Sequence, residues 1–140
     1  MREILFRGKT KTGFWIEGFL FQTECDGVKE WCISMSPLSA NDYSEILGDY
    51  GEVIPETVGQ YTGLTDKNGK KIFEGDIVLF PWGEKREVFS VEFVEGEFEA
   101  IPKRKSTDIW CIRIGSYAPE FEVIGNIHDN PELLKGGGEG

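Results

Sequence analysis

Glycine-rich turn signals, placed between short apolar stretches, constrain this chain more than any other feature of its sequence. Two segments show the pattern most clearly: residues 59–80, which spell GQYTGLTDKNGKKIFEGDIVLF, and residues 123–134, which spell VIGNIHDNPELL. The first predicts a turn, a short strand, a second turn and a buried strand, because Asn-Gly and glycine between acidic residues favour tight turns. The second predicts a strand that ends in a polar turn. We therefore expect a mainly β fold with little helix.

Apolar residues also alternate with a period of two near the N-terminus, which is the pattern of a β-strand. The Asp26-Gly27 pair is predicted to join a strand over residues 14–22 to a second strand over residues 30–35 in a hairpin. The first of these strands carries large apolar side chains on both expected faces. One face holds Phe14, Ile16 and Leu20, and the other holds Trp15, Phe19 and Phe21.

The later part of the chain repeats this alternation. Residues 76–80 predict a core strand, and Gly96 separates predicted strands over residues 88–95 and 97–101. Alternation groups further residues on apolar strand faces, namely Phe89, Val91, Phe93, Trp110, Ile112, Ile114, Phe121 and Val123.

Helix signals are few. Residues 39–47 form the best helical candidate, although their weak periodicity also fits a loop. Asn130 is predicted to cap a single helical turn that starts at Pro131.

Length and composition limit the class of protein. A chain of 140 residues forms one domain or two small subdomains and can fold without a disulfide or a metal. The sequence has no apolar run of membrane-spanning or signal-peptide length, so we expect a cytoplasmic location. The three cysteines lack Cys-x-x-Cys spacing and His128 is the only histidine, so we expect no zinc and no cofactor. Cys32 and Cys111 are expected to pack as small hydrophobic residues.

The net charge of −10 is unevenly distributed. Residues 1–12 carry a net +3, residues 13–60 carry −8 and residues 61–140 carry −5. An acidic middle repels phosphate backbones and attracts basic partners. This distribution favours a protein partner over nucleic acid.

Several blocks of the sequence resemble the YopX family, which is encoded by phages and prophages. The blocks are REILFR at residues 2–7, QYTGLTDKNG at 60–69, IFEGDIV at 72–78, VIGNIH at 123–128 and NPELL at 130–134. The resemblance implies a mainly β fold with an SH3-like barrel in the C-terminal half. We accordingly expect a strand-rich subdomain over residues 1–58, an SH3-like barrel over residues 59–134 and a flexible tail over residues 135–140. The resemblance implies neither an activity nor a set of site residues.

Asp66, Glu74 and Asp76 form an acidic trio around two predicted turns. Three carboxylates could hold a divalent cation for a metal-dependent hydrolase. The favoured interpretation is structural, since Asx side chains accept hydrogen bonds from the backbone of their own turn. The predicted structural turn motif comprises Asp66, Asn68, Gly69, Glu74, Gly75 and Asp76.

His128 beside Asp129 could act as a general base, but no nucleophile of a known pattern accompanies it. A polar turn is the preferred interpretation of this segment. The chain also lacks a Walker loop, Gly-x-Gly-x-x-Gly and His-Glu-x-x-His, which argues against P-loop hydrolysis and zinc proteolysis.

Lysine and arginine clusters provide the sequence basis for a nucleic-acid-binding barrel. These clusters are Lys67, Lys70, Lys71, Lys85, Arg86, Lys103, Arg104 and Lys105, with Tyr61, Phe73, Trp82 and Phe98 as possible stacking residues. Interleaved glutamates favour solvated loop charge instead.

Trp15, Phe19 and Phe21 form the candidate interaction surface, because a bare apolar face of this size is unusual on a soluble monomer. A second copy of the chain or another sheet of the same chain could cover it, so a homo-oligomer is possible. The sequence thus favours a non-enzymatic phage or prophage accessory protein that binds another protein. A nucleic-acid-binding barrel is the first alternative, and a hydrolase using the acidic trio is the second.

Overall fold

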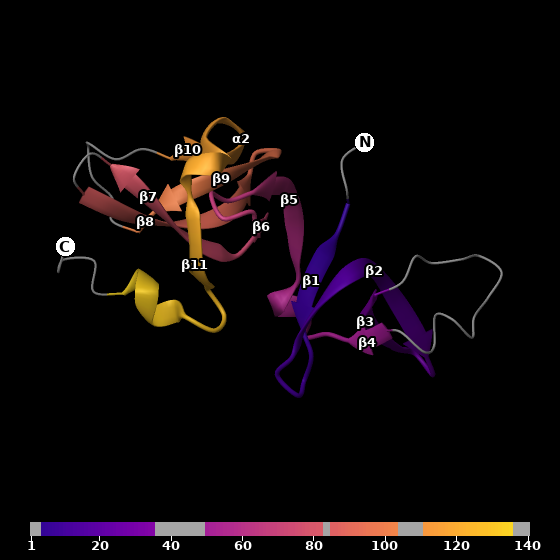
Figure 1. Cartoon of the computed structure of the whole chain (residues 1–140). Coiled ribbons are helices and arrows are strands. Elements are labelled where there is room, and N and C mark those ends of the chain that lie inside the picture. The colour runs from indigo at the N-terminus through magenta and orange to yellow at the C-terminus, as the bar shows by residue number, and fades with distance from the viewer. Residues whose placement is uncertain (1–3, 36–49, 83–84, 104–110, 136–140) are drawn as a thin grey trace. The chain divides into compact units, whose positions relative to one another are not determined.

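The computed structural model describes residues 4–35, 50–82, 85–103 and 111–135. The described chain is mainly β, with two antiparallel sheets and little helix (Figure 1). It divides into two compact units, Met1–Tyr61 and Thr62–Gly140. The division falls inside a strand, a few residues after the boundary predicted between residues 58 and 59. Within the described residues, no helix combines the length and the apolar character needed to cross a membrane.

Unit 1 is built from one strongly curved antiparallel sheet. Its elements are β1 (Phe6–Lys9), β2 (Trp15–Cys25), β3 (Val28–Ser34), β4 (Tyr50–Glu52), the 3-10 turn η1 (Pro55–Thr57) and the start of β5 (Gly59–Thr65). The complete sheet has the order β4-β3-β2-β1-β5-β6, in which β6 (Lys71–Phe73) belongs to unit 2.

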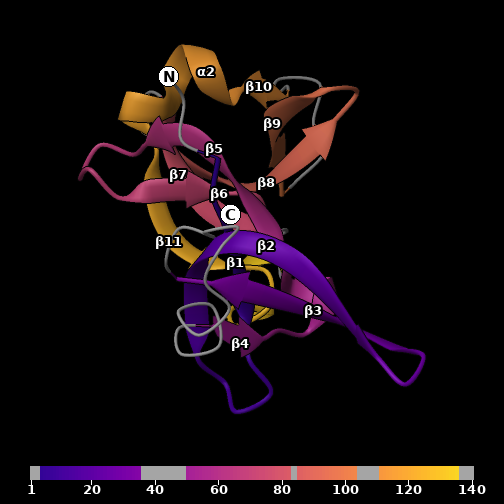
Figure 2. The same cartoon turned by 90° about the vertical axis from the view of Figure 1, so that its right-hand side faces the viewer.

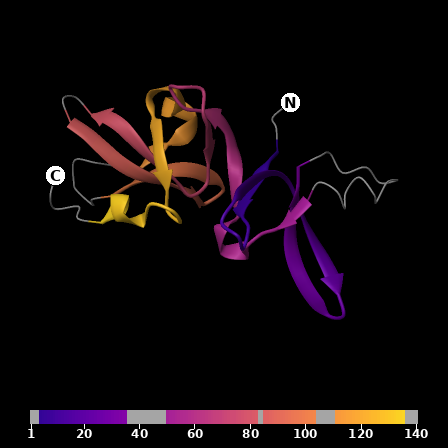
Figure 3. The same cartoon turned by 60° about the horizontal axis from the view of Figure 1, so that its bottom comes forward.

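The β2–β3 hairpin is the longest element pair of unit 1 and confirms the hairpin predicted from Asp26-Gly27. Asp26 and Gly27 have φ angles of 50° and 80°, which are the left-handed values that a two-residue type I′ turn requires. Since β4 pairs only with Cys32 through Ser34, the outer part of the hairpin is a two-stranded ribbon. Figures 2 and 3 show this ribbon extending beyond β4.

The two faces of β2 have different surroundings. Gly18 and Ile33 lie on the inner face together with Val53, and all three are buried. The side chain missing at Gly8 leaves room for Val53, because a Cβ at Gly8 would lie 2.9 Å from the Cβ of Val53. The small residues of β1 and β2 thus allow close packing where the curved sheet folds over itself.

Unit 2 contains the second sheet. Its elements after β6 are β7 (Asp76–Trp82), β8 (Lys85–Val94), β9 (Glu97–Pro102), β10 (Ile112–Arg113), α2 (Ile114–Tyr117), η2 (Ala118–Glu120), β11 (Glu122–Asn126) and η3 (Pro131–Leu134). The strands are ordered β10-β9-β8-β7-β11.

Over the described residues, β10 and β11 form the two edges of this five-stranded sheet and do not pair with each other, so the sheet is open. The closed barrel expected from the family resemblance is therefore not found. The physical reason lies in β10, which has only two residues before the chain turns into α2 and so offers little backbone for a further ladder.

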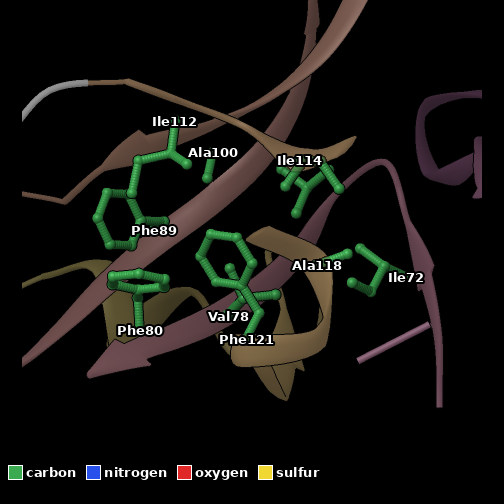
Figure 4. Packing of buried hydrophobic residues seen from close by; sticks show 10 residues of the cluster. Ile72, Val78, Phe80, Phe89, Ala100, Ile112, Ile114, Ala118 and Phe121 are labelled. Carbon is green, nitrogen blue, oxygen red and sulfur yellow. The ribbon is translucent and has the colours of Figure 1, made fainter. Parts of the chain in front are cut away.

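The core of unit 2 is an apolar cluster between the sheet and the helical turns (Figure 4). Phe80, Phe89 and Phe121 lie beside one another, with ring centroids 5.0–6.4 Å apart. Phe89 and Phe121 are fully buried. These contacts fall in the range of favourable aromatic pairs and hold β7, β8 and the start of β11 together.

Some other sequence predictions need correction or fall outside the described residues. The sequence predicts a strand through Ile114, but Ile114 is the first residue of α2, and its side chain is buried there. Cys32 is buried as predicted, whereas Cys111 is exposed at the edge strand. The helical candidate over residues 39–47, Trp110 and the tail beyond residue 135 lie outside the described residues.

Candidate functional site

Asp66 is the centre of the predicted turn motif, and its carboxylate binds backbone rather than ligand. Oδ1 accepts hydrogen bonds from the backbone N–H groups of Asn68 (2.8 Å) and Lys70 (2.9 Å). Oδ2 accepts one from Val123 (2.9 Å), which opens the C-terminal signature 57 residues later. Asp66 is only 5% exposed. It therefore joins the two most distinctive segments of the sequence.

The electrostatics of Asp66 agree with this role. Burial raises the pKa of the carboxyl group, but the backbone hydrogen bonds from Val123, Lys70 and Asn68 together hold it below its usual value. The side chain is accordingly a carboxylate at neutral pH, and its negative charge is stabilised by the turn that it closes.

The second turn of the motif, over residues 73–76, is held in the same way. Asp76 is 1% exposed, and its Oδ2 accepts a hydrogen bond from the backbone N–H of Phe73 (2.7 Å). Gly75 donates to Val91 O (2.8 Å) and accepts from Ile127 N–H (2.9 Å). Gly69 and Gly75 have φ angles of 80° and 92°, which confirms the prediction that both occupy turns.

Two members of the acidic trio, Asp66 and Asp76, thus stabilise backbone turns. Asp66 and Asp76 both bind backbone N–H groups, and Glu74 lies half-buried between them in sequence. Among the residues that the structure describes, no group of three histidine, cysteine, aspartate or glutamate side chains could hold a metal ion. No observation in these residues favours the hydrolase alternative.

The segment around His128 is a closed polar loop. Asn126 Oδ1 accepts hydrogen bonds from the backbone N–H groups of His128 (3.0 Å) and Asp129 (2.9 Å). Asn130 was predicted to cap η3, but no side-chain capping bond forms there. Its Oδ1 instead accepts from the backbone N–H of Asn126 (3.2 Å). A Cβ at Gly125 would lie 2.6 Å from that oxygen, so glycine makes room for the Asn130 side chain.

The predicted interaction surface lies on the outer face of β2. Trp15, Phe19 and Phe21 share this face, because side chains two residues apart point to the same side of a strand. Phe19 is 36% exposed, and Phe21 is half-buried against Tyr50, with ring centroids 5.6 Å apart.

Cationic side chains cover part of this face. The Arg7 guanidinium lies 4.9 Å from the centre of the Trp15 ring, and the Lys9 ammonium lies 6.0 Å from it. Both distances permit cation–π attraction. Two of the N-terminal cations noted in the sequence, Arg7 and Lys9, therefore lie at the aromatic face. Trp15 is less available to a partner than its neighbour Phe19.

The aromatic residues expected to support nucleic-acid stacking are mostly buried. Tyr61 is 7% exposed and Phe73 is 2% exposed. Phe98 is half-buried against Phe93, with ring centroids 5.0 Å apart, and Lys67 is ion-paired with Glu122 at 3.4 Å. Arg104 and Lys105 lie outside the described residues, as does the side chain of Trp82. The described residues do not assemble the predicted basic, aromatic face.

Unit 2 carries an apolar cavity that the sequence analysis did not predict. Its volume is about 310 Å³, and its described lining comes from β7, the β10 region and α2. The lining residues are Phe80, Cys111, Ile112, Arg113, Ser116 and Tyr117. α2 follows β10 directly along the chain (Figure 2), so the lining residues between 111 and 117 come from one continuous segment. No local pattern signals this site, since Phe80 and Tyr117 are distant in sequence and meet only in the fold.

The cavity has a buried base and an exposed wall. Phe80 and Ile112 are 8% and 9% exposed and belong to the apolar cluster of Figure 4. Tyr117 is 46% exposed and packs edge-on against Phe80, with ring centroids 5.9 Å apart. Arg113 forms the polar rim and its Nε is 3.4 Å from Glu97 Oε1.

Comparison with solved structures finds similarity over almost the whole chain. The crystal structure of protein EF1440 from Enterococcus faecalis is similar with a TM-score of 0.52 and 25% sequence identity, over 96% of this chain and 100% of that chain. No functionally curated protein matches the sequence.

A family model gives the clearest relationship. The model described as YopX protein matches residues 6–135, which include every motif block from the central turn to the C-terminal loop. Those blocks are the segments that Asp66 and the Gly75 turn join in the structure. This chain belongs to the YopX family.

Proposed function

We propose that this YopX protein is a phage or prophage accessory protein that acts without catalysis, by binding another protein in the bacterial cytoplasm. The observation that carries the proposal is the apolar cavity of unit 2, walled by the exposed Tyr117 and floored by the buried Phe80. Concave apolar sites with a few polar groups are the usual places where ligands bind.

In this proposal the protein uses no cofactor, and the two turns around Asp66 and Asp76 have a structural role only. The two buried aspartates bind backbone N–H groups at 2.7–2.9 Å. Carboxylates used in this way stabilise a fold and offer little to a substrate. A metal-dependent hydrolase using Asp66, Glu74 and Asp76 is therefore the least supported function.

We also propose that unit 2 is related to SH3-like barrels. The support is its strand order, β10-β9-β8-β7-β11, in which a four-stranded meander is followed by a helical turn and a last strand beside the first. Domains of this type present peptide-binding grooves lined with aromatic residues.

Nucleic-acid binding is the alternative, and one observation favours it. Arg7 and Lys9 gather over Trp15 on the outer face of β2, a combination that suits single-stranded nucleic acid. The −8 over residues 13–60 opposes it. A gel shift with DNA at physiological salt tests the nucleic-acid alternative. We expect a dissociation constant no tighter than the ~10⁻⁴–10⁻⁶ M of non-specific contacts.

Affinity capture tests the proposed function. The tagged full chain would be incubated with lysate of the host bacterium, before and after infection, with and without nuclease. We expect at least one protein to remain bound after nuclease treatment and to be absent from the tag alone. Loss of all captured protein upon nuclease treatment would contradict the proposal and support the nucleic-acid alternative.

A further inference from the structure

The β2–β3 hairpin of unit 1 has one long strand edge without a ladder partner among the described residues. β1 pairs with β2 only from Trp15 to Gly18, whereas β3 pairs with the other side of β2 from Phe19 to Cys25. In the part of the chain that the structure describes, the backbone N–H and C=O groups on the outer side of residues 19–25 therefore have no strand beside them. We call this stretch the β2 edge.

The other edges of the two sheets are protected in ways that natural proteins use against strand pairing. β4, β6 and β10 have only two or three residues each, and β11 contains a register shift between Val123 and Gly125. The outer edge of β3 over residues 28–30 carries Lys29 and Glu30. The β2 edge has seven residues, and its sequence FLFQTEC contains neither lysine nor proline. Of these edges, it is the one best suited to accept another strand.

Large apolar side chains flank the β2 edge. Phe19 is exposed and Phe21 is half-buried on one face, and Leu20 is half-buried on the other. A strand that paired with this edge would cover part of these side chains and form ladder hydrogen bonds at the same time. Backbone pairing and apolar burial thus favour the same occupant, an extended strand.

The register of the β2 edge fits the same stretch of a second copy of the chain. An antiparallel pair centred on Gln22 sets the seven residues of one copy against the seven of the other, and it ends before Gly18, where β1 already occupies the edge. Gln22 then faces Gln22 of the second copy, and Phe21 faces Thr23. A centre closer to Gly18 would place the second strand against β1, and a centre closer to the hairpin turn would leave apolar residues unpaired.

Charge also favours a second copy. Glu24 is the only charged residue of the β2 edge, and in this register it faces Leu20 of the second copy rather than the other Glu24. Within its own hairpin, Glu24 pairs with Lys29, which has the opposite charge. No like charges among the seven residues therefore meet across the two-fold axis. Such a contact is closed, as in most homo-oligomers.

We propose that two copies of the chain associate through the β2 edge, so that the hairpin of one copy continues into the hairpin of the other as one antiparallel sheet. The two-fold axis passes at Gln22. Because residues that face each other in a sheet share one side of it, the aromatic face of Phe19 and Phe21 continues from one copy to the next. The inference concerns unit 1 alone and is independent of the cavity in unit 2.

Disulfide trapping tests the register. The background variant carries Cys25→Ser and Cys111→Ser, which remove the exposed thiols and keep the buried Cys32. Gln22→Cys places two thiols on facing residues, whose Cα atoms are ~4.5–5.5 Å apart in an antiparallel pair, within the range of a disulfide. Glu24→Cys is the matched control, because its two thiols would lie about 14 Å apart along the strands. We expect oxidation to yield at least about tenfold more covalent dimer from Gln22→Cys than from the control.

Charge substitutions give a second measurement that needs no cysteine. Gln22→Glu sets two carboxylates against each other at the axis, next to both Glu24 side chains, and should raise the dissociation constant of the dimer at least about tenfold in sedimentation analysis. Val28→Glu adds the same charge at an exposed position on the β3 side of the hairpin and should leave the constant unchanged. An equimolar mixture of Gln22→Glu and Gln22→Lys should restore association, because opposite charges then meet.

Three results would overturn the inference: a wild type that stays monomeric at micromolar concentration, no preference for crosslinking in Gln22→Cys over Glu24→Cys, or an unchanged dissociation constant in Gln22→Glu. Association that survives Gln22→Glu would assign the contact between copies to another surface.

Discussion

A single carboxylate, that of Asp66, holds three backbone N–H groups from two parts of the sequence. The group is buried, and each bond has a charged acceptor, which strengthens it relative to a neutral bond. A residue placed in this way matters for stability well beyond the turn in which it lies. Its contribution also depends on pH in a direction that the structure determines.

Asp66→Asn should destabilise the protein by about 1–3 kcal/mol, because the amide carries one acceptor oxygen and turns an NH₂ group toward backbone donors. Urea unfolding at pH 7 measures this. Asp26→Asn is the control, because Asp26 is exposed in a left-handed turn that asparagine tolerates, and it should change stability by less than about 0.5 kcal/mol. Equal stability of the two variants would contradict the role of Asp66.

Wild type and Asp66→Asn also test how the stability contribution of Asp66 depends on pH. The folded-state pKa of Asp66 is lowered, so its carboxylate stabilises the fold fully above the unfolded value of about 3.8. That contribution is lost as the pH falls through the folded pKa. The stability gap between wild type and Asp66→Asn should therefore shrink below about pH 4. A gap that stays constant down to pH 2 would contradict this account.

Gly18 is a second residue whose identity the fold requires. A Cβ there would lie 1.9 Å from the carbonyl oxygen of Ser34, and backbone cannot yield as a side-chain end can. Gly18→Ala should cost at least about 1–3 kcal/mol in thermal or urea unfolding. Gly115→Ala, which meets nothing within 4 Å, should cause no loss. Equal stabilities would show that β2 and β3 are less closely packed than described.

At the scale of elements, the loop after β11 is held by asparagine side chains rather than by its histidine. Asn126→Ala removes the acceptor for the N–H groups of His128 and Asp129. We expect hydrogen exchange at these two amides to accelerate by about tenfold, equivalent to ~1.4 kcal/mol, while Phe89 in the core keeps its protection. Unchanged exchange at both loop amides would refute the loop's dependence on Asn126.

Strand alternation and turn chemistry predicted most of the elements. The pattern around Asp26-Gly27 gave the hairpin, and Asn68-Gly69 gave the central turn, since both depend on local backbone preference. The prediction that a strand continues through Ile114 was wrong. Ile112 and Ile114 are both buried, as in a strand, but the chain turns into α2 at Ile114. Alternation alone cannot distinguish the two.

The sites were less predictable than the strands. The structural role of Asp66 followed from its residue type, but its bond to Val123 depends on a contact across 57 residues. The cavity depends on Phe80 and Tyr117 meeting, and these two residues are far apart in the sequence. The candidate surface of Trp15, Phe19 and Phe21 was predictable as a shared strand face, whereas the covering of Trp15 by Arg7 was not.

For the whole molecule, the outer face of β2 remains a candidate contact between copies of the chain. Phe19 is exposed there next to half-buried Phe21. We expect light scattering to show a homo-oligomer at micromolar concentration and Phe19→Glu to reduce its mass, because a buried charge opposes association. Ile127→Glu, on the other unit, should keep the wild-type mass. A monomeric wild type would end this prediction.

The central claim is that the chain functions by binding a protein through a surface separate from its family motifs. Its most direct test is quantitative mass spectrometry of proteins captured from nuclease-treated host lysate by wild type, Tyr117→Ala and Ile127→Ala. We predict one enriched partner that Ile127→Ala retains and Tyr117→Ala loses by about tenfold or more. If no protein were enriched over the tag alone, or if all three chains captured the same amount, the measurement would contradict the claim.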